Sequence, residues 1–368
     1  MRNVFKRKTV GLFLCSFIVT VLLTSISTFA DDKLLMNHAQ KKEILVERDV
    51  TLEPPLWCGN NAFLIVDKEE KLIMIDFLNS KREIISNPHN VTIEACTSDG
   101  EWLLYSNRQS VRWDKNSYER GVIDFWRYNF KTGKRQKFAV ACDGSDIVIS
   151  LDGKKILFSG PKPRSFIKQP APEWELLWSK GKWEPGRSMD PLWLNDSSKI
   201  VILSNNKLFI EEPDKNTIHQ FNSDLGLLKN LRIDRFNRIY ALASPKPPNM
   251  KTDLLKYRLI RCSIKDKNLE CEDLISRDKS IARYDMTPDG KNIVFIEGGK
   301  SWKENTCVWY LSEGREAECI TSLADINSSL SISPDGRWAT YARQRKKETV
   351  RGVDVYTNDL FVIKLKNE

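Results

Sequence analysis

Two stretches near the carboxyl end of the chain decide the fold: Thr287-Pro288-Asp289-Gly290-Lys291-Asn292-Ile293-Val294-Phe295 and Ser333-Pro334-Asp335-Gly336-Arg337-Trp338-Ala339-Thr340-Tyr341. Each joins a tight turn to an apolar run. Glycine accepts a positive φ, aspartate hydrogen-bonds the backbone of its own turn, and proline fixes φ where no sheet donor is needed. Both stretches therefore predict a β-hairpin whose second strand is buried.

The same pattern recurs at intervals of about forty to fifty residues along the chain. Clear copies contain Asp99-Gly100 and Asp152-Gly153, and degraded copies begin at Asn60, Asp196 and Arg235. Further β-rich runs follow each copy, so one unit has room for four antiparallel strands. Such a repeat predicts an all-β fold, the β-propeller, which we expect to have seven four-stranded blades. Six or eight blades are the alternatives.

A spare β-rich run, Glu43 to Glu47, precedes the first unit, whereas the last unit has only three strands. We expect this run to supply the missing outer strand and close the ring, because an open array would leave unpaired strand edges. The expected product is one closed, monomeric domain.

The Ser/Thr-Pro-Asp-Gly-x-x-apolar pattern resembles the repeat of the TolB-type β-propeller family, over essentially all of the chain after residue 30. The resemblance implies a propeller fold and suggests an acidic protein surface as partner. It says little else about function. The chain departs from WD-repeat propellers, since its Trp113-Asp114 pair lies in an expected loop instead of ending a strand.

The first thirty residues have the pattern of a cleaved leader. A basic start is followed by the apolar run 10–27, and Thr28-Phe29-Ala30 supplies small residues before Asp31. An uncleaved signal anchor is the alternative, because the apolar run approaches the length of a membrane span. We therefore expect a signal peptide at 1–30, a single propeller domain at 31–368, and a periplasmic or secreted protein.

Seven cysteines follow the leader, and in an exported protein they indicate disulfides. Cys262 and Cys271 lie symmetrically about one expected hairpin turn, and Cys307 and Cys319 about another, so both pairs are expected to face each other across a hairpin. Cys58 and Cys96 precede the first turns of adjacent units and form the third expected pair. Cys142 competes for the same partners, and we expect it to be free.

Motifs of catalysis are scarce. The chain has three histidines, none in an H-E-x-x-H motif, and it has neither a G-x-S-x-G elbow nor a phosphate-binding loop. We expect no catalytic residue, no cofactor and no metal site. A propeller nevertheless brings carboxylates of distant blades to one centre, so a hydrolase or lyase acting in the channel stays an alternative.

Function in a propeller is expected in its loops. The longest loops join the second and third strands of their units and should emerge on one face. They are residues 107–121, 160–173, 245–256, 298–306 and 343–358. These loops carry more Lys and Arg than Asp and Glu, whereas the rest of the chain after the leader has an acidic excess. A merely solubilising surface is the alternative interpretation.

We expect a partner to bind this basic face, since cations attract anionic partners and aromatic side chains anchor interfaces. The candidate residues are Arg112, Trp113, Lys162, Arg164, Trp302, Arg345, Lys346 and Lys347. The expected partner is an acidic envelope or secreted protein, or an anionic glycan, and neither nucleic acid nor a membrane. An inhibitor or immunity factor that caps a secreted enzyme is a further alternative.

Overall fold

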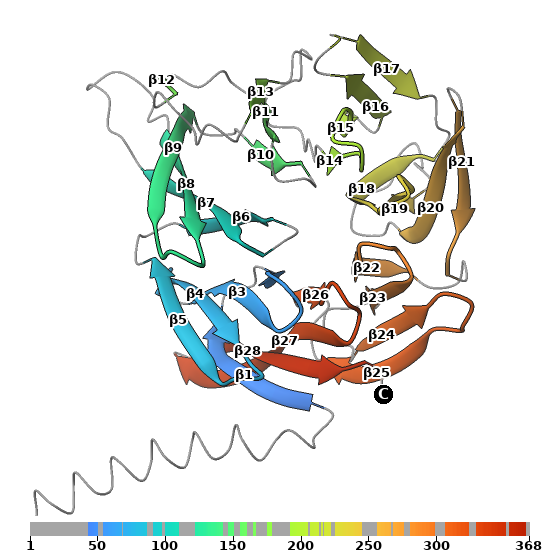
Figure 1. Cartoon of the computed structure of the whole chain (residues 1–368). Helices are drawn as coiled ribbons and strands as arrows, with labels where there is room; N and C mark the ends of the chain where they lie inside the picture. Colours follow the sequence, from blue (N-terminus) through green and yellow to red (C-terminus); the bar gives the residue numbers. More distant parts are fainter. Residues whose placement is uncertain are drawn as a thin grey trace, which may run out of the picture.

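The computed structural model is a ring of β-sheets (Figure 1). It describes residues 43–365 except for a set of gaps. The gaps are 51–53, 68, 87–90, 98–99, 110–121, 143–145, 151–154, 160–164, 167–174, 179–191, 205–206, 213–214, 216, 222–224, 245–255, 266–267, 276–279, 299–305, 324–328 and 351–352. The expected signal peptide lies outside the described residues. In the described part, no helix has the length and hydrophobicity needed to cross a bilayer.

Six antiparallel blades of four strands each make up most of the ring. The first three are blade 1, with β2 (Leu56–Trp57), β3 (Ala62–Val66), β4 (Leu72–Asp76) and β5 (Lys81–Ser86); blade 2, with β6 (Val91–Cys96), β7 (Trp102–Gln109), β8 (Val122–Asn129) and β9 (Arg135–Cys142); and blade 3, with β14 (Leu192–Trp193), β15 (Ile200–Ser204), β16 (Lys207–Glu212) and β17 (Thr217–Phe221).

The other three blades complete the ring. They are blade 4, with β18 (Leu227–Ile233), β19 (Ile239–Ser244), β20 (Arg258–Lys265) and β21 (Asn268–Asp273); blade 5, with β22 (Ile281–Met286), β23 (Asn292–Glu297), β24 (Thr306–Ser312) and β25 (Glu318–Leu323); and blade 6, with β26 (Leu330–Ile332), β27 (Trp338–Val350), β28 (Val353–Lys364) and the amino-terminal β1 (Glu43–Val50).

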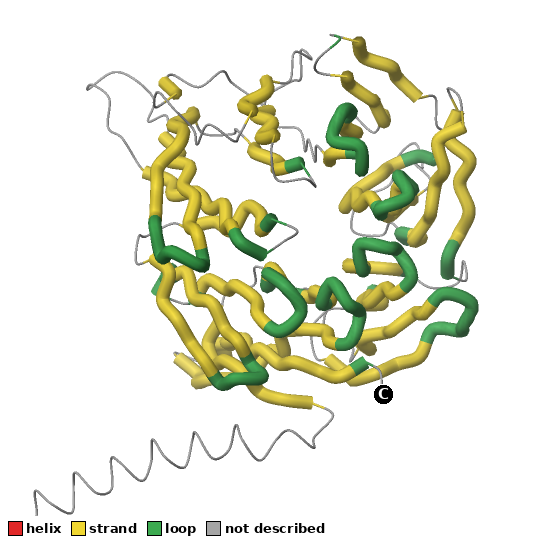
Figure 2. The backbone as a smooth tube through the Cα atoms, in the orientation of Figure 1, coloured by secondary structure: helices red, strands yellow, loops and turns green. Residues whose placement is uncertain are grey.

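Burial explains the order of strands within a blade. The second strands, such as β19 and β23, are apolar on both faces and almost wholly buried, because each blade packs between two others. The outermost strands, such as β5 and β17, contain more polar residues and are partly exposed. The innermost strands of consecutive sheets contact one another around the whole ring, and short turns surround its centre (Figure 2).

The expectation of seven four-stranded blades is wrong. Between blades 2 and 3 the described chain forms a three-stranded sheet of β10 (Asp146–Ile149), β11 (Lys155–Ser159) and β13 (Glu175–Trp178). Strand β13 pairs parallel with β11, and the connection between them includes β12 (Ser165–Phe166), which pairs with the outer strand β9 of blade 2. A parallel pair requires a crossover connection, so this unit cannot continue as the expected antiparallel meander.

Closure by the amino-terminal strand is confirmed. Strand β1 pairs antiparallel with β28, from Glu43 opposite Ile363 to Val50 opposite Asn358. Cross-chain ion pairs accompany this register: Arg343 Nη2 lies 2.8 Å from Glu43 Oε1, and Arg82 of blade 1 binds Glu47. The first described strand is therefore attached both to the closing blade and to blade 1.

The three expected disulfides are present. Cys58–Cys96 joins blades 1 and 2, Cys262–Cys271 lies across β20 and β21, and Cys307–Cys319 lies across β24 and β25. Cys262 and Cys271 face each other directly, as expected. Cys307 and Cys319 do not, because a register shift in their hairpin offsets them. The side chain of Cys142 lies outside the described residues. Three disulfides indicate an oxidising compartment.

Candidate binding site

The turn between β18 and β19 of blade 4, residues Asp234 to Arg238, is held by a buried carboxylate. Asp234 Oδ1 accepts the backbone N–H groups of Phe236 and Arg238, both at 2.9 Å, and Asp234 Oδ2 lies 2.5 Å from Arg238 Nε. Asn237 adopts a φ of 62° and donates its N–H to the Asp234 carbonyl. A buried charge needs such a partner and such hydrogen bonds. The Asp234 carboxylate therefore has its counter-charge and its hydrogen-bond donors within its own turn.

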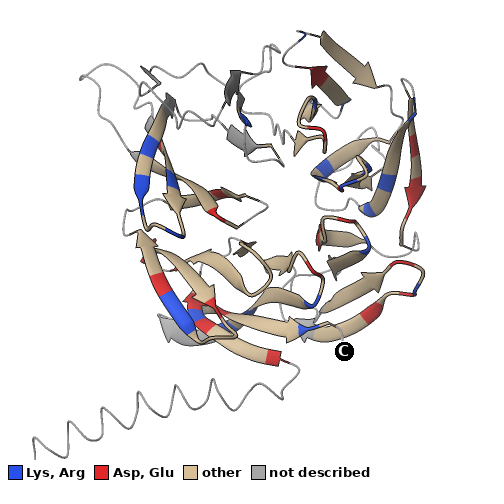
Figure 3. Cartoon of the chain, viewed as in Figure 1, with Lys and Arg blue, Asp and Glu red and all other residues tan. Residues whose placement is uncertain are grey.

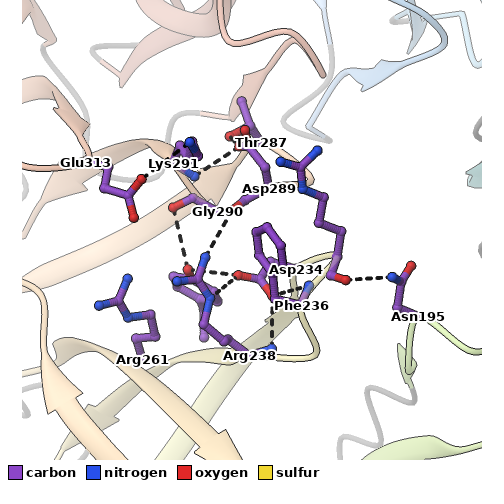
Figure 4. Close-up of polar contacts among 12 residues, drawn as sticks. Asn195, Asp234, Phe236, Arg238, Arg261, Thr287, Asp289, Gly290, Lys291 and Glu313 are labelled. Carbon is purple, nitrogen blue, oxygen red and sulfur yellow. Dashed lines mark hydrogen bonds and ion pairs between the residues drawn. The ribbon is translucent and has the colours of Figure 1, made fainter.

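Both neighbouring blades are bonded to this turn (Figure 4). Asn195 of blade 3 donates its side-chain amide to the Arg235 carbonyl, and its backbone N–H to Asn237 Oδ1, both at 2.6 Å. On the other side, the Arg235 N–H reaches the Pro288 carbonyl at 2.7 Å, and Arg238 Nη2 reaches the Asp289 carbonyl at 3.1 Å. The blade 4 turn is thus fixed from two directions.

Tyr240 of β19 contacts the Asp234 carboxylate beneath the surface of the turn. Its side chain is fully buried, and its hydroxyl donates to Asp234 Oδ2 at 3.2 Å. Burial, and next the negative charge of Asp234, raise the pKa of Tyr240 to about 12. The hydroxyl therefore stays protonated at neutral pH and acts as a structural donor.

The turn also carries an exposed aromatic ring, that of Phe236. Phe236 is 55 % exposed, and the guanidinium carbons of Arg235 and Arg238 lie 4.9 and 5.1 Å from its ring centroid. These distances are within the range of cation–π attraction. We call Arg235, Phe236 and Arg238 the Arg-Phe-Arg cluster.

A small polar cavity of about 200 Å³ lies next to the cluster, between blades 4 and 5. Three cationic side chains line it, those of Arg261, Lys291 and Arg315, together with Glu313. Arg261 is bound to Glu272, and Lys291 Nζ lies 3.7 Å from Glu313 Oε2. The lining therefore has three cations and one carboxylate, and two of the cations, Arg261 and Lys291, already have a carboxylate partner within the chain.

The described part of the chain has no cluster of three or more metal-ligating side chains. Its Lys and Arg residues are spread over several blades alongside Asp and Glu (Figure 3). The arrangement at the Arg-Phe-Arg cluster can bind an acidic and apolar surface, and the buried Asp234 is already neutralised by Arg238.

Most of the site residues expected from the sequence lie outside the part of the chain that the structure describes. Arg112, Trp113, Lys162, Arg164 and Trp302 lie outside the described residues, and the side chains of Lys346 and Lys347 do too. Arg345 was expected in a loop, which is wrong: residues 343–350 belong to β27 and residues 353–358 to β28, and Arg345 lies opposite Thr357 in this strand pair.

Arg345 also has acidic partners within the chain. Its guanidinium binds Asp359 of β28 at 2.7 Å and Asp49 of β1 at 3.1 Å. It joins the closing strand to the blade, so ring closure explains its position. Sequence reasoning missed the Arg-Phe-Arg cluster, although one signal was present: the degraded copy has Arg235 and Phe236 where the copy in blade 5 has Pro288 and Asp289.

Comparisons with known proteins support the fold and no more. No family model and no curated protein matches the sequence. The β-propeller domain of the Trilobed protease from Pyrococcus furiosus has a similar structure, with 13 % identity, a TM-score of 0.53, and coverage of 86 % of this chain and 94 % of that one. The acylaminoacyl peptidase of Pyrococcus horikoshii is similar at 12 % identity and a TM-score of 0.51, over 84 % of this chain and half of that one (50 %).

A putative TolB from Agrobacterium tumefaciens is also among the structural neighbours, at 12 % identity and a TM-score of 0.44, over 86 % of this chain and 91 % of that one. This is too distant to assign the TolB-type family. The β-propeller fold is shown, and the family stays a resemblance.

Proposed function

We propose that the chain is an exported, non-catalytic binding protein that receives an acidic segment of a partner protein at the Arg-Phe-Arg cluster. The observation that carries the proposal is the exposure of Phe236, within about 5 Å of two guanidinium groups, on a turn that is bonded to both neighbouring blades. Aromatic and arginine side chains dominate the binding energy of interfaces, and a rigid turn loses little entropy on binding.

The adjacent cavity extends this surface. An apolar side chain of the partner would pack on Phe236, while a carboxylate next to it would reach the cations around the 200 Å³ cavity. Because the cations on the surface are exposed, their attraction is screened over roughly 8 Å at physiological ionic strength. Affinity should therefore fall as salt rises.

Site-specific photo-crosslinking tests the proposal. A photoreactive amino acid at position 236 should give a discrete adduct in the native envelope, and the cross-linked peptide should be acidic. The same amino acid at Leu78, which is 50 % exposed on blade 1, is the matched control. With the partner in hand, Phe236→Ala should weaken binding at least tenfold through faster dissociation, without changing the melting temperature. Equal cross-linking at 78 and 236, or an unchanged affinity, would overturn the proposal.

A further inference from the structure

A second group of cations lies away from the Arg-Phe-Arg cluster, on the strands nearest the ring axis. Lys229 belongs to β18 of blade 4 and Arg283 to β22 of blade 5. Contacts next to them bring the two strands together: the Tyr284 hydroxyl donates to the Asn230 carbonyl at 2.7 Å, and Arg232 Nε lies 3.6 Å from Asp285 Oδ1. Lys229 and Arg283 are each adjacent in sequence to the first of these contacts.

Tyr257 completes the group. The Lys229 ammonium lies 3.7 Å from the centroid of the Tyr257 ring, and the Tyr257 carbonyl accepts the N–H of Ile281, at the start of β22. The aromatic ring thus fixes the ammonium beside the strand that carries Arg283. Both cationic side chains are only partly exposed.

Neither cation has a carboxylate within ion-pair distance among the described residues. Elsewhere in the described blades, partly buried cations do have one, as in Lys137–Asp124, Arg258–Asp273 and Arg343–Glu43. The nearest carboxylate on these strands, Asp285, is already bonded to Arg232 and to the backbone N–H of Ile332. Two like charges on neighbouring strands, with no counter-charge among the described residues, disfavour each other's charged form.

The electrostatics of Lys229 agree with this geometry. Burial, and after it the positive charge of Arg283, lower the pKa of the Lys229 ammonium below its ordinary value. A bound anion would offset both effects, since it would supply a counter-charge and hydrogen-bond acceptors.

We propose that Lys229 and Arg283 form a binding site for a small oxyanion, with Tyr257 positioning the ammonium. The guanidinium offers paired donors to two oxygens, and the ammonium adds a point charge, which fits a phosphate or carboxylate group. This site is independent of the Arg-Phe-Arg cluster, so either proposal can fail without the other.

Calorimetric titration and thermal melting of the purified protein test the site, with inorganic phosphate and succinate as probes. Sodium chloride at matched ionic strength is the baseline. We expect one equivalent of oxyanion to bind and to raise the melting temperature above the chloride baseline. Tighter binding of phosphate identifies a phosphate group as the natural ligand, and tighter binding of succinate identifies a carboxylate. No binding of either probe would overturn the proposal.

Two variants locate the site. Lys229→Met and Arg283→Met should each weaken oxyanion binding at least tenfold, and without anion they should melt no lower than the unmodified protein, because each removes an uncompensated charge. Lys215→Met is the control, since Lys215 is exposed and paired with Glu212 on blade 3. Retention of the full anion effect in both Lys229→Met and Arg283→Met would place the anion elsewhere and overturn the assignment.

Discussion

The turns of blades 4 and 5 begin alike, since the N–H of the fourth residue bonds the carbonyl of the first in both, but their side chains differ and the blade 5 turn is one residue longer. In blade 5, the Thr287 hydroxyl accepts the Asn292 N–H and donates to Asp289 Oδ1, while Gly290 takes the positive φ of 68°. In blade 4, the buried Asp234 carboxylate accepts the turn's N–H groups by itself, and Asn237 takes the positive φ. A single buried acid thus replaces a hydroxyl and a partly exposed acid.

This difference shows how a repeat can acquire a binding surface. Because Asp234 holds the blade 4 turn from inside, the two following positions are released from holding it, and they carry Arg235 and Phe236. In blade 5 the corresponding positions are Pro288 and Asp289, and Asp289 bonds its own turn. In the degraded copy of blade 4, Arg235 and Phe236 are therefore exposed and can contact a partner.

Replacing Asp234 by alanine should lower the free energy of unfolding far more than replacing Asp289. Asp234→Ala leaves the Arg238 guanidinium and two backbone N–H groups without their partner, so it should lower the free energy of unfolding by about 3–5 kcal/mol. Asp289→Ala leaves the Thr287 hydroxyl in place and should cost about 1 kcal/mol. Urea denaturation measures both. Similar losses for the two variants would mean that Asp234 does not hold its turn.

Gly290 in the blade 5 turn and Gly314 in the β24–β25 turn both have a positive φ, but their surroundings differ. A Cβ at Gly290 would lie 2.3 Å from the Tyr240 hydroxyl and 2.8 Å from Asp234 Oδ2, whereas a Cβ at Gly314 would meet nothing within 4 Å. Both positions have positive φ, so alanine costs about 1–2 kcal/mol at either. Gly290→Ala should cost about 1–3 kcal/mol more than Gly314→Ala, because blade 4 presses against that turn. Equal melting temperatures would argue against this close contact.

The turn acids of blades 5 and 6 should contribute weakly to the loss of stability in acid. Burial opposes ionisation of Asp289, but hydrogen bonds from the Thr287 hydroxyl and the Lys291 N–H outweigh it and hold the pKa of Asp289 below 3.8; for Asp335, bonds from Ser333 and Arg337 do the same. A carboxyl whose pKa is lower in the folded state stabilises above its unfolded pKa and loses this as pH falls through the folded value. In Asp289→Asn and Asp335→Asn, stability should fall less between pH 5 and pH 2, by about 0.5 kcal/mol each. If the free energy of unfolding of both variants fell between pH 5 and pH 2 by as much as that of the unmodified protein, the prediction would be wrong.

Local signals explain what the sequence could predict of the fold. Asp289-Gly290 and Asp335-Gly336 specify turns by their own chemistry, and the intervals between copies specify a ring. The paired cysteines follow from hairpin spacing, and the closing strand follows from a final unit with too few strands. The three-stranded sheet escaped this reasoning, because a parallel β11–β13 pair depends on a crossover and no short turn motif encodes it.

The candidate site was harder to predict for a related reason. Phe236 and its arginines are adjacent in sequence, but their exposure depends on bonds from Asn195 and to Pro288, which lie on other blades. Lys229 and Arg283 come together only because two inner strands are neighbours in the ring. Net charge in a segment indicated basic loops, yet it could not show that Arg345 binds Asp49, almost three hundred residues earlier in the chain.

The pairing of β1 with β28 also sets an order of events in folding. Strand β1 must keep an unpaired edge until its partner has been made and folded, and over that interval the edge is open to wrong pairing with another chain. The entropy lost in closing such a long loop grows only with the logarithm of its length, so closure is late without being costly at equilibrium. The unpaired strand β1 carries three acidic residues, Glu43, Glu47 and Asp49. Each of them is bound to an arginine in the closed ring. Repulsion between these charges disfavours pairing of β1 with the same strand of another copy before the ring is complete.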